Sequence, residues 1–418
     1  MVISTVQGYY YFGITTLSAA PSRAPLGPLL QPILDNVART YECGVGVGVR
    51  LSDGTALSLA SGSTDGKARL ARPSDRWVWG SVTKLLTGAS VLRLVEEGRL
   101  ALNDTIVSHV DPILAAQRAA APSAMNFSSL AELYGDAVNA VTVEQCARMQ
   151  SGIPDYDTAK PDESPPTDAF RAEVYADPTR DWSPFELISL PWVRTGALDF
   201  PPGSRTSYSS TNFVILGILL AAVNGTGAPG TAWENFSQGD AALPNTTLYP
   251  SLRFGVTGAP ARYTNVSGFD RTPFNGQDPS ARPGVDVSAA HGVFGGWTAS
   301  DVVGDVQDIA NFAFDLFGSQ VVVEPRYVSM MVPKNDRVFY SFATFNLDWE
   351  TGHGHHSPAH RERLRLRSDA AAVPDYSIAY GHLGATYGFG ASTCFCSFSF
   401  FSLLCVVMSL IIQISKIL

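Results

Sequence analysis

The sequence predicts a globular protein that mixes α-helices with β-strands, and three stretches support that prediction. Apolar residues recur at helical spacing over Leu29–Tyr41, which indicates an amphipathic helix facing a core. Over Cys43–Leu51 valines alternate with glycines, and an Asp53-Gly54 turn then leads to a second strand ending at Ala60, a pattern typical of a β-hairpin. The glycines leave one face of the first strand bare, so we expect a helix to lie close against it. The third stretch, Trp77–Gly98, predicts a helix that ends at a glycine.

Length and charge limit the class of protein. The chain of 418 residues is long enough for one large domain or two ordinary ones. Its net charge of -9 argues against a nucleic-acid partner. The basic run Arg361–Arg367 is short and is typical of a solvated loop or strand face.

Further elements follow along the chain. Thr142–Met149 predicts a short capped helix, and Val214–Val223 predicts a buried one. Residues 225–284 are rich in loop-forming residues. Thr298–Asp301 predicts the cap of a helix that carries apolar residues over Val302–Leu316.

Ser81 and Lys84 form the first candidate catalytic pair. Positions three apart share one face of a helix, so Ser81 Oγ and Lys84 Nζ can meet at its first turn. A hydroxyl becomes a good nucleophile when a base takes its proton, and a desolvated lysine amine can be that base. Taken alone, Ser81 is equally explained as a helix cap.

Two later stretches add chemistry. Tyr208 stands on a predicted turn just before a helix, from which its hydroxyl could relay protons. Taken alone, Tyr208 is better explained as a tyrosine that packs its ring and bonds to backbone. The glycines of Ala379–Phe389 allow the backbone to approach a substrate closely, and this strand can offer an N–H to an oxyanion.

Together these motifs resemble those of the serine β-lactamase and penicillin-binding-protein superfamily. The sequence has Ser81-x-x-Lys84, then Tyr208-Ser209-Ser210, then His382-Leu383-Gly384, in the order of that superfamily. Leu94–Leu100, Ser151–Tyr156 and Gly295–Asp301 also look like its branch of class C β-lactamases, D-Ala-D-Ala carboxypeptidases and family VIII esterases. The resemblance runs from about residue 28 to residue 396.

The resemblance implies a fold and a division of the chain. The fold is α/β (α+β): an antiparallel sheet flanked by helices, with a large helical insertion, as in β-lactamases and transpeptidases. The expected β-lactamase-related domain spans residues 25–396. Its α/β part is 25–75 with 286–396, and its helical and loop part is 76–285. Residues 1–24 are a candidate signal or disordered segment.

The resemblance also assigns roles, those of a serine hydrolase with no metal and no cofactor. Ser81 would be acylated, Lys84 would be the general base, and Tyr208 would assist proton transfer. The backbone N–H groups of Ser81 and Ala385 would form the oxyanion hole. The expected substrate-binding residues are Ser210, His382, Leu383 and Gly384.

Two departures from the family pattern bear on the substrate, which we expect to be a small ester, amide or peptide. Ser210 replaces an asparagine and lacks an amide for a peptide-like side chain. Leu383 cannot donate a hydroxyl to a substrate carboxylate, and His382 is a weaker cation than the lysine often found there. Both changes point away from anionic β-lactams. The alternative is a catalytically silent relative that binds or scaffolds.

The apolar tail over residues 394–415 has three explanations. It is long enough and apolar enough to be a transmembrane anchor. It could instead be a remaining strand of the sheet in apolar form, or a wrongly predicted terminus, which we favour slightly. Under the first and third explanations the sheet loses its closing strands, and the enzyme is impaired.

Secretion is the expected localisation, with the protein extracellular or membrane-attached. Glycosylation sequons stand at Asn103, Asn126, Asn224, Asn235, Asn245 and Asn265. The histidines at 353, 355, 356 and 360 fit a surface loop better than a metal site.

Overall fold

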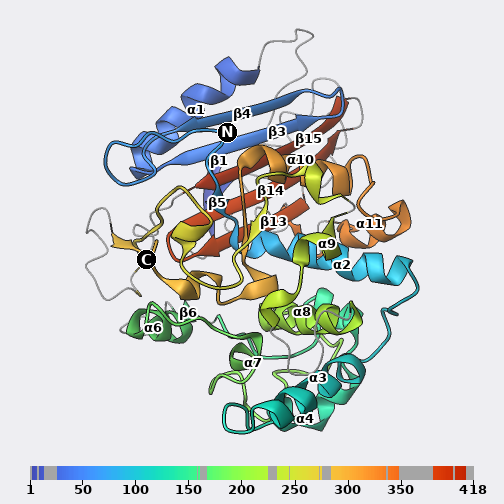
Figure 1. Cartoon of the computed structure of the whole chain (residues 1–418). Helices are drawn as coiled ribbons and strands as arrows, with labels where there is room; N and C mark the ends of the chain where they lie inside the picture. Colours follow the sequence, from blue (N-terminus) through green and yellow to red (C-terminus); the bar gives the residue numbers. More distant parts are fainter. Residues whose placement is uncertain are drawn as a thin grey trace, which may run out of the picture.

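The described part of the chain forms an antiparallel sheet with helices packed against it and a mainly helical region below it. The computed structural model describes residues 2–6, 9–13, 26–157, 159–160, 167–224, 233–243, 245–272, 274, 284–335, 338–347, 380–398 and 401–410. Figure 1 shows the sheet in the upper half, α2 across the middle, and α3, α4, α7 and α8 below it. The mixed α/β fold predicted from the sequence is confirmed.

The elements have the following bounds. The α-helices are α1 Leu26–Tyr41, α2 Thr83–Glu96, α3 Ile106–Ala120, α4 Ala131–Tyr134, α5 Val143–Ala147, α6 Ala169–Ala176, α7 Pro184–Leu187, α8 Thr211–Val223, α9 Gln238–Ala242, α10 Val306–Phe317 and α11 Pro325–Met331. The strands are β1 Val2–Val6, β2 Tyr9–Gly13, β3 Val45–Leu51, β4 Ala56–Ser61, β5 Trp77–Val78, β6 Ala159–Lys160, β7 Thr167–Asp168, β8 Arg253–Phe254, β9 Phe269–Asp270, β10 Val285–Asp286, β11 Val302–Gly304, β12 Phe345–Asn346, β13 Tyr380–Thr386, β14 Phe389–Phe398 and β15 Phe401–Leu410. Short 3₁₀ turns include η1 Gly80–Val82, η7 His291–Phe294 and η8 Trp297–Ala299.

The main sheet has six strands in the order β12-β13-β14-β15-β3-β4, and every neighbouring pair is antiparallel. The predicted hairpin is its β3–β4 edge, with Gly54 at φ +90° in the turn. The bare face of β3 lies against α10, as predicted. A Cβ on Gly48 would come within 2.0 Å of Val306 O, and one on Gly46 within 3.0 Å of Val306 Cγ1. Any larger residue at position 48 would therefore push the helix away.

The C-terminal tail is a strand of this sheet, which corrects the transmembrane prediction. Along β15, Val407 pairs with Thr393 of β14 and with Gly48 of β3, so the strand lies inside the sheet. In the part of the chain that the structure describes, no helix has the length and apolarity needed to span a bilayer. The transmembrane explanation is therefore wrong, and Phe401–Leu410 forms an apolar strand that closes the sheet. The wrongly predicted terminus stays a prediction.

The helix predicted from Thr298 begins later than expected. Val302–Gly304 is a strand, β11, between β5 and β8 in a three-stranded sheet, and α10 starts only at Val306. Asp305 is its cap, because its carboxylate accepts hydrogen bonds from the N–H groups of Gln307 and Asp308. The apolar run Val302–Leu316 therefore contains a strand followed directly by a helix, and an uninterrupted apolar pattern does not show the boundary between them.

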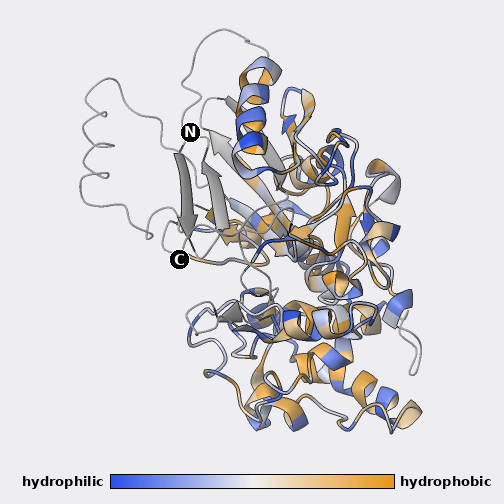
Figure 2. Cartoon of the chain, turned by 90° about the vertical axis from the view of Figure 1, so that its left-hand side faces the viewer, coloured by the Kyte–Doolittle hydropathy of each residue, from blue (hydrophilic) through white to orange (hydrophobic). Residues whose placement is uncertain are grey.

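Other predicted helices are confirmed. The α1 helix buries Leu34 and Val37, and in Figure 2 it carries blue and orange residues side by side, as an amphipathic helix does. The α5 helix starts with a capping box between Thr142 and Gln145. In α8, every residue from Thr211 to Ala221 is buried.

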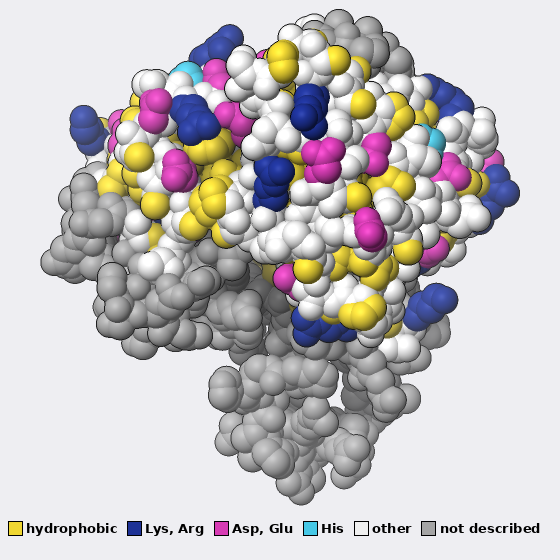
Figure 3. All heavy atoms as spheres, turned by 90° about the horizontal axis from the view of Figure 1, so that it is seen from below, with side chains coloured by type: hydrophobic (Ala, Val, Ile, Leu, Met, Phe, Trp, Pro, Cys, Tyr) yellow, Lys and Arg dark blue, Asp and Glu magenta, His cyan; other side chains and the backbone are white. Residues whose placement is uncertain are grey.

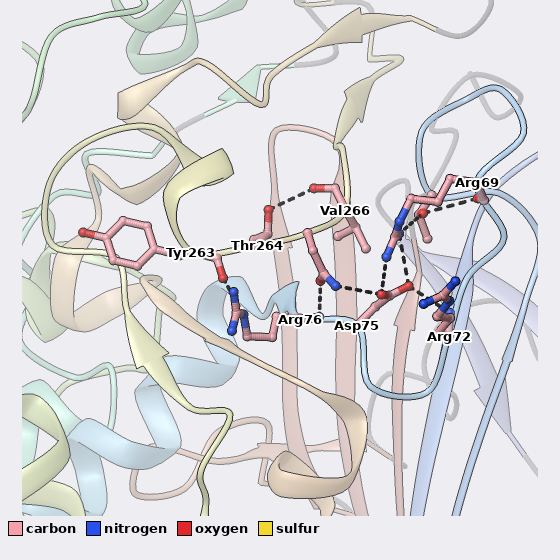
Figure 4. A network of polar contacts seen from close by, with 9 residues as sticks. Arg69, Arg72, Asp75, Arg76, Tyr263, Thr264 and Val266 are labelled. Atoms are coloured by element: carbon pink, nitrogen blue, oxygen red, sulfur yellow. Dashed lines mark hydrogen bonds and ion pairs between the residues drawn. The ribbon is translucent and has the colours of Figure 1, made fainter.

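A polar network holds the segment that leads into the candidate site (Figure 4). Asp75 is buried and accepts hydrogen bonds from the Arg69 guanidinium, from Arg72 N and from Asn265 Nδ2. Arg76 Nε donates to Tyr263 O at 2.7 Å. The network joins residues 69–76 to residues 263–265, so β5 and the turn that follows it start from a fixed point.

Candidate active site

Ser81 lies in the turn that joins β5 to α2. β5 pairs with β11, and Gly80 has φ +51°, which turns the chain out of the strand and into the η1 turn before α2 begins at Thr83. This backbone conformation favours glycine. The serine is therefore presented half-buried, one turn before the regular helix that was expected to carry it.

Lys84 points back at the serine from the first turn of α2. Its Nζ lies 2.8 Å from Ser81 Oγ and donates to Ala299 O at 2.9 Å. The side chain is fully buried. Burial lowers the pKa of Lys84 to about 7, although the nearby carboxylates of Asp155 and Asp157 oppose the effect. The amine is thus ready to lose its proton near neutral pH while touching a serine hydroxyl.

Tyr208 joins this pair from a different part of the chain. It stands three residues before α8, and its ring centroid lies 5.2 Å from Lys84 Nζ. The ring stacks on Phe345 of β12, with centroids 5.4 Å apart and planes inclined by 14°. The structure therefore brings the first two predicted motifs together, with the tyrosine held by packing against the sheet.

Strand β13 runs directly beside the serine turn. A Cβ on Gly384 would come within 2.0 Å of Trp79 O and 3.2 Å of Ser81 N. A Cβ on Gly80 would come within 3.0 Å of Ala385 N. Only glycines permit this approach, which brings the turn at Gly80 and Ser81 close to the backbone of Gly384 and Ala385. An oxyanion hole built from the N–H groups of Ser81 and Ala385 needs these two segments to lie side by side.

His382 is fully buried, and both its ring nitrogens are engaged inside the protein. Nδ1 lies 2.6 Å from Leu383 O, an oxygen that can only accept, so Nδ1 carries the proton. Nε2 lies 2.9 Å from Tyr340 Oη, and accepts from that hydroxyl when the imidazole is neutral. Burial, followed by the charge of Lys84, holds the pKa of His382 well below its ordinary value. Its ring offers no cation and no free nitrogen to a substrate.

The other predicted substrate-binding residues lie around the same place. Ser210 is buried and its backbone N–H donates to Asp155 Oδ1 at 2.8 Å. Leu383 is half-buried, next to the buried Gly384. The structure thus places Ser210 directly before α8 and Leu383 on β13.

Sequence reasoning missed several partners of Lys84. Ala299 and Asp155 lie in stretches that carried the family resemblance but received no role. Asp155 could have been singled out from the sequence because it is an acidic residue directly after Pro154. Tyr340 had no signal, because nothing in its local sequence relates it to His382.

The remaining site predictions differ in where they fall. Of the sequon asparagines, Asn224 is half-buried and the rest are exposed: Asn103, Asn126, Asn235, Asn245 and Asn265. The Asn265 amide nitrogen donates to Asp75 at 2.9 Å. Histidines 353, 355, 356 and 360 lie outside the described residues, within which no three His, Cys, Asp or Glu side chains are placed to hold a metal ion. Figure 3 shows charges of both signs interspersed on the face seen from below.

Comparisons with known proteins show the family of the chain. The Beta-lactamase family model matches residues 35–397. The curated Protein flp of Staphylococcus aureus (strain NCTC 8325 / PS 47) is 25% identical over 153 residues, which is 37% of this chain and only 24% of that protein. The chain therefore matches about a quarter of the length of that relative.

Solved structures share the fold at low sequence identity. A D-stereospecific amidohydrolase from Streptomyces sp. is 18% identical with a TM-score of 0.61, covering 92% of this chain and 94% of its own. D-amino acid amidase from Ochrobactrum anthropi SV3, complexed with D-phenylalanine, is 16% identical with a TM-score of 0.63 and 92% coverage of both chains. A penicillin-binding protein from Bacillus halodurans is 15% identical with a TM-score of 0.57, covering 91% and 95%.

Proposed function

The chain belongs to the β-lactamase family of serine hydrolases, and on that premise we propose that it hydrolyses a small amide or ester through an acyl-enzyme at Ser81. One observation carries the proposal. A fully buried amine with a pKa lowered to about 7 lies 2.8 Å from a serine hydroxyl. A buried lysine without such a task is costly, because burial penalises its charged form.

The residues supply each step of an acyl transfer. Lys84 Nζ takes the proton of Ser81 Oγ as the oxygen attacks the substrate carbonyl. The N–H groups of Ser81 and Ala385 stabilise the oxyanion, which then collapses and expels the amine or alcohol. Tyr208, beside Lys84, passes a proton to that leaving group and takes in return the proton that Lys84 holds, so that Lys84 is again neutral. Water then attacks the ester at Ser81 with Lys84 again as the base, and releases the carboxylic acid.

The substrate class follows from what surrounds the pair. His382 presents no cation and Leu383 no hydroxyl, so a carboxylate next to the scissile bond gains nothing here. This favours an amide or ester without that carboxylate over a penicillin. Two of the structural neighbours are named for amide hydrolysis, a D-stereospecific amidohydrolase and a D-amino acid amidase, which supports the amide choice.

The test is covalent labelling. The purified chain is exposed to a fluorophosphonate, which reacts with activated serines, and the intact mass is measured. One adduct is expected on the wild type and none on Ser81→Ala. A panel of amino acid amides, acetate esters and a chromogenic cephalosporin then ranks substrates, with the cephalosporin expected last. A folded wild type that forms no adduct would contradict the proposed hydrolase function and favour a catalytically silent binding protein.

A further inference from the structure

The turn after Pro154 is bonded to the segment that carries Tyr208. Asp155 Oδ1 accepts from Ser210 N at 2.8 Å, and Thr211 Oγ1 accepts from Tyr156 N at 2.9 Å. Ser151 Oγ adds a third bond, donating to Asn212 Oδ1 at 2.5 Å. Residues 151–156 therefore set where the Tyr208 turn sits relative to α2.

The same turn brings negative charge to Lys84. Nζ of Lys84 forms hydrogen bonds with two neutral oxygens, Ser81 Oγ and Ala299 O. The negative charges of Asp155 and Asp157 favour the protonated form of this amine and so oppose the effect of burial. The turn therefore supplies the negative charge that acts on Lys84.

Three further side chains that face Lys84, those of Tyr208, Phe213 and His382, carry no charge. The rings of Tyr208 and Phe213 lie 5.2 and 5.7 Å from Nζ. His382, from β13, is neutral because its pKa is held well below the ordinary value. Arg171 acts on Asp157 rather than on Lys84. Among these groups and those of the turn, only Asp155 and Asp157 therefore place charge near Lys84.

We propose that Asp155, assisted by Asp157, is a positioning residue of the active site: it holds the Tyr208 turn in place through its bond to Ser210 N and supplies negative charge to the site of Lys84. The proposal rests on the hydrolase function proposed above. It assigns Asp155 no contact with the substrate.

The direction of the effect follows from the charges. A negative carboxylate favours the protonated form of Lys84, so removing it makes the proton easier to lose. Burial and the neighbouring Asp157 raise the pKa of Asp155 itself to about 7. Asp155 and Lys84 therefore titrate over the same pH range, and their titrations are coupled. Asp155→Asn keeps an oxygen that can accept from Ser210 N and removes the charge. The acid limb of the rate of acylation then moves to lower pH.

The experiment measures the rate of fluorophosphonate labelling from pH 5 to 9. In Asp155→Asn the midpoint of the acid limb is expected about one pH unit below the wild type. In Asp157→Asn a smaller shift in the same direction is expected. Asp136→Asn, an exposed carboxylate elsewhere on the chain, is the matched control and keeps the wild-type midpoint. Asp155→Ala, which loses the bond as well, lowers the plateau in addition to the shift.

The outcomes separate this proposal from the function it rests on. A wild type that is never labelled overturns the hydrolase and this role with it. A labelled wild type whose midpoint is unchanged or raised in Asp155→Asn overturns the role of Asp155 alone. Thermal melting checks folding, and if Asp155→Asn does not fold, Asp155→Ser and Asp157→Asn carry the same test, with an unmoved midpoint overturning the proposal.

Discussion

Two cations in this molecule, the buried Lys84 and the half-buried Arg171, have opposite kinds of partner. Arg171 of α6 makes direct ion pairs: its Nε lies 2.9 Å from Asp168 Oδ2, and Nη1 contacts Asp270 Oδ2. Burial alone would lower the pKa of Arg171, but Asp270 and Asp168 outweigh it and raise that pKa above its ordinary value. Lys84 of α2 bonds to neutral oxygens, and burial outweighs the carboxylates of Asp155 and Asp157, which lowers the pKa of Lys84 to about 7.

The partners of the two cations account for this difference in pKa: Arg171 has carboxylates in direct contact, and Lys84 has neutral oxygens. A direct pair with satisfied hydrogen bonds keeps a cation charged and fixes the elements it joins. Arg171 also lies 4.5 Å over the ring of Tyr387, so it ties α6 and β9 to the β13–β14 turn. A buried amine whose partners are neutral oxygens is easily deprotonated. Such an amine can act as a catalytic base but contributes little to the stability of the fold. Structural and catalytic cations can therefore be distinguished by their partners.

Replacing Lys84 is expected to have the largest effect, and it falls on the rate. In Lys84→Met the labelling of Ser81 should slow by about 10²- to 10⁴-fold, the range for a positioned base. Rates of fluorophosphonate labelling at pH 8, compared with the wild type, measure it. A variant that is labelled at the wild-type rate would mean that another group activates Ser81.

The same variant has a stability signature whose sign is fixed by the pKa shift. The unfolded chain holds a proton on Lys84 up to about pH 10.5, and the folded chain only up to about pH 7. Raising the pH from 7 to 9 therefore favours the folded wild type and not Lys84→Met. The difference in free energy of unfolding, wild type minus variant, should rise over that range in urea titrations. A flat difference would contradict the lowered pKa.

Replacing Arg171 should affect stability instead. Arg171→Met leaves the buried carboxylates of Asp168 and Asp270 without their cation, which costs about 3 to 5 kcal/mol of unfolding free energy. Urea unfolding measures it. Arg118→Met is the matched control, because its pair with Glu132 is 3.5 Å long and exposed, so the cost should be under about 1 kcal/mol. Equal losses in both variants would remove the contrast between direct buried pairs and surface pairs.

The sequence predicted the residues on the helical side of the site better than those around them. Ser81, Lys84 and Tyr208 were found because each belongs to a short motif with a chemical reason for its spacing, and the structure brings them together. Asp155 and Ala299 act on Lys84 only through tertiary contacts, which spacing does not encode. The hydrogen-bond partner of His382 Nε2 is Tyr340, 42 positions away, and a local sequence pattern cannot predict that contact.

The fold could be predicted wherever a sequence pattern fits only one kind of secondary-structure element. The β3 glycines predicted the close approach of α10, because alternation fixes which face they occupy. The tail was not predictable in the same way. An uninterrupted apolar run fits a buried central strand as well as a membrane span, and only pairing with β14 and β3 distinguishes them.

The smallest predicted effect concerns a neutral pair next to Lys84. Tyr340→Phe removes the hydroxyl that donates to His382 Nε2 and leaves that buried nitrogen without its partner, at a cost of about 1 to 2 kcal/mol in urea unfolding. The labelling rate at pH 8 should stay within about threefold of the wild type, because Lys84 keeps both its oxygens. Tyr263→Phe, whose half-buried hydroxyl donates to Thr257 O, is the control and should cost less. Should Tyr340→Phe slow labelling more than tenfold while remaining stable, His382 would belong with Lys84 among the groups that move protons, and burial with neutral partners would mark both.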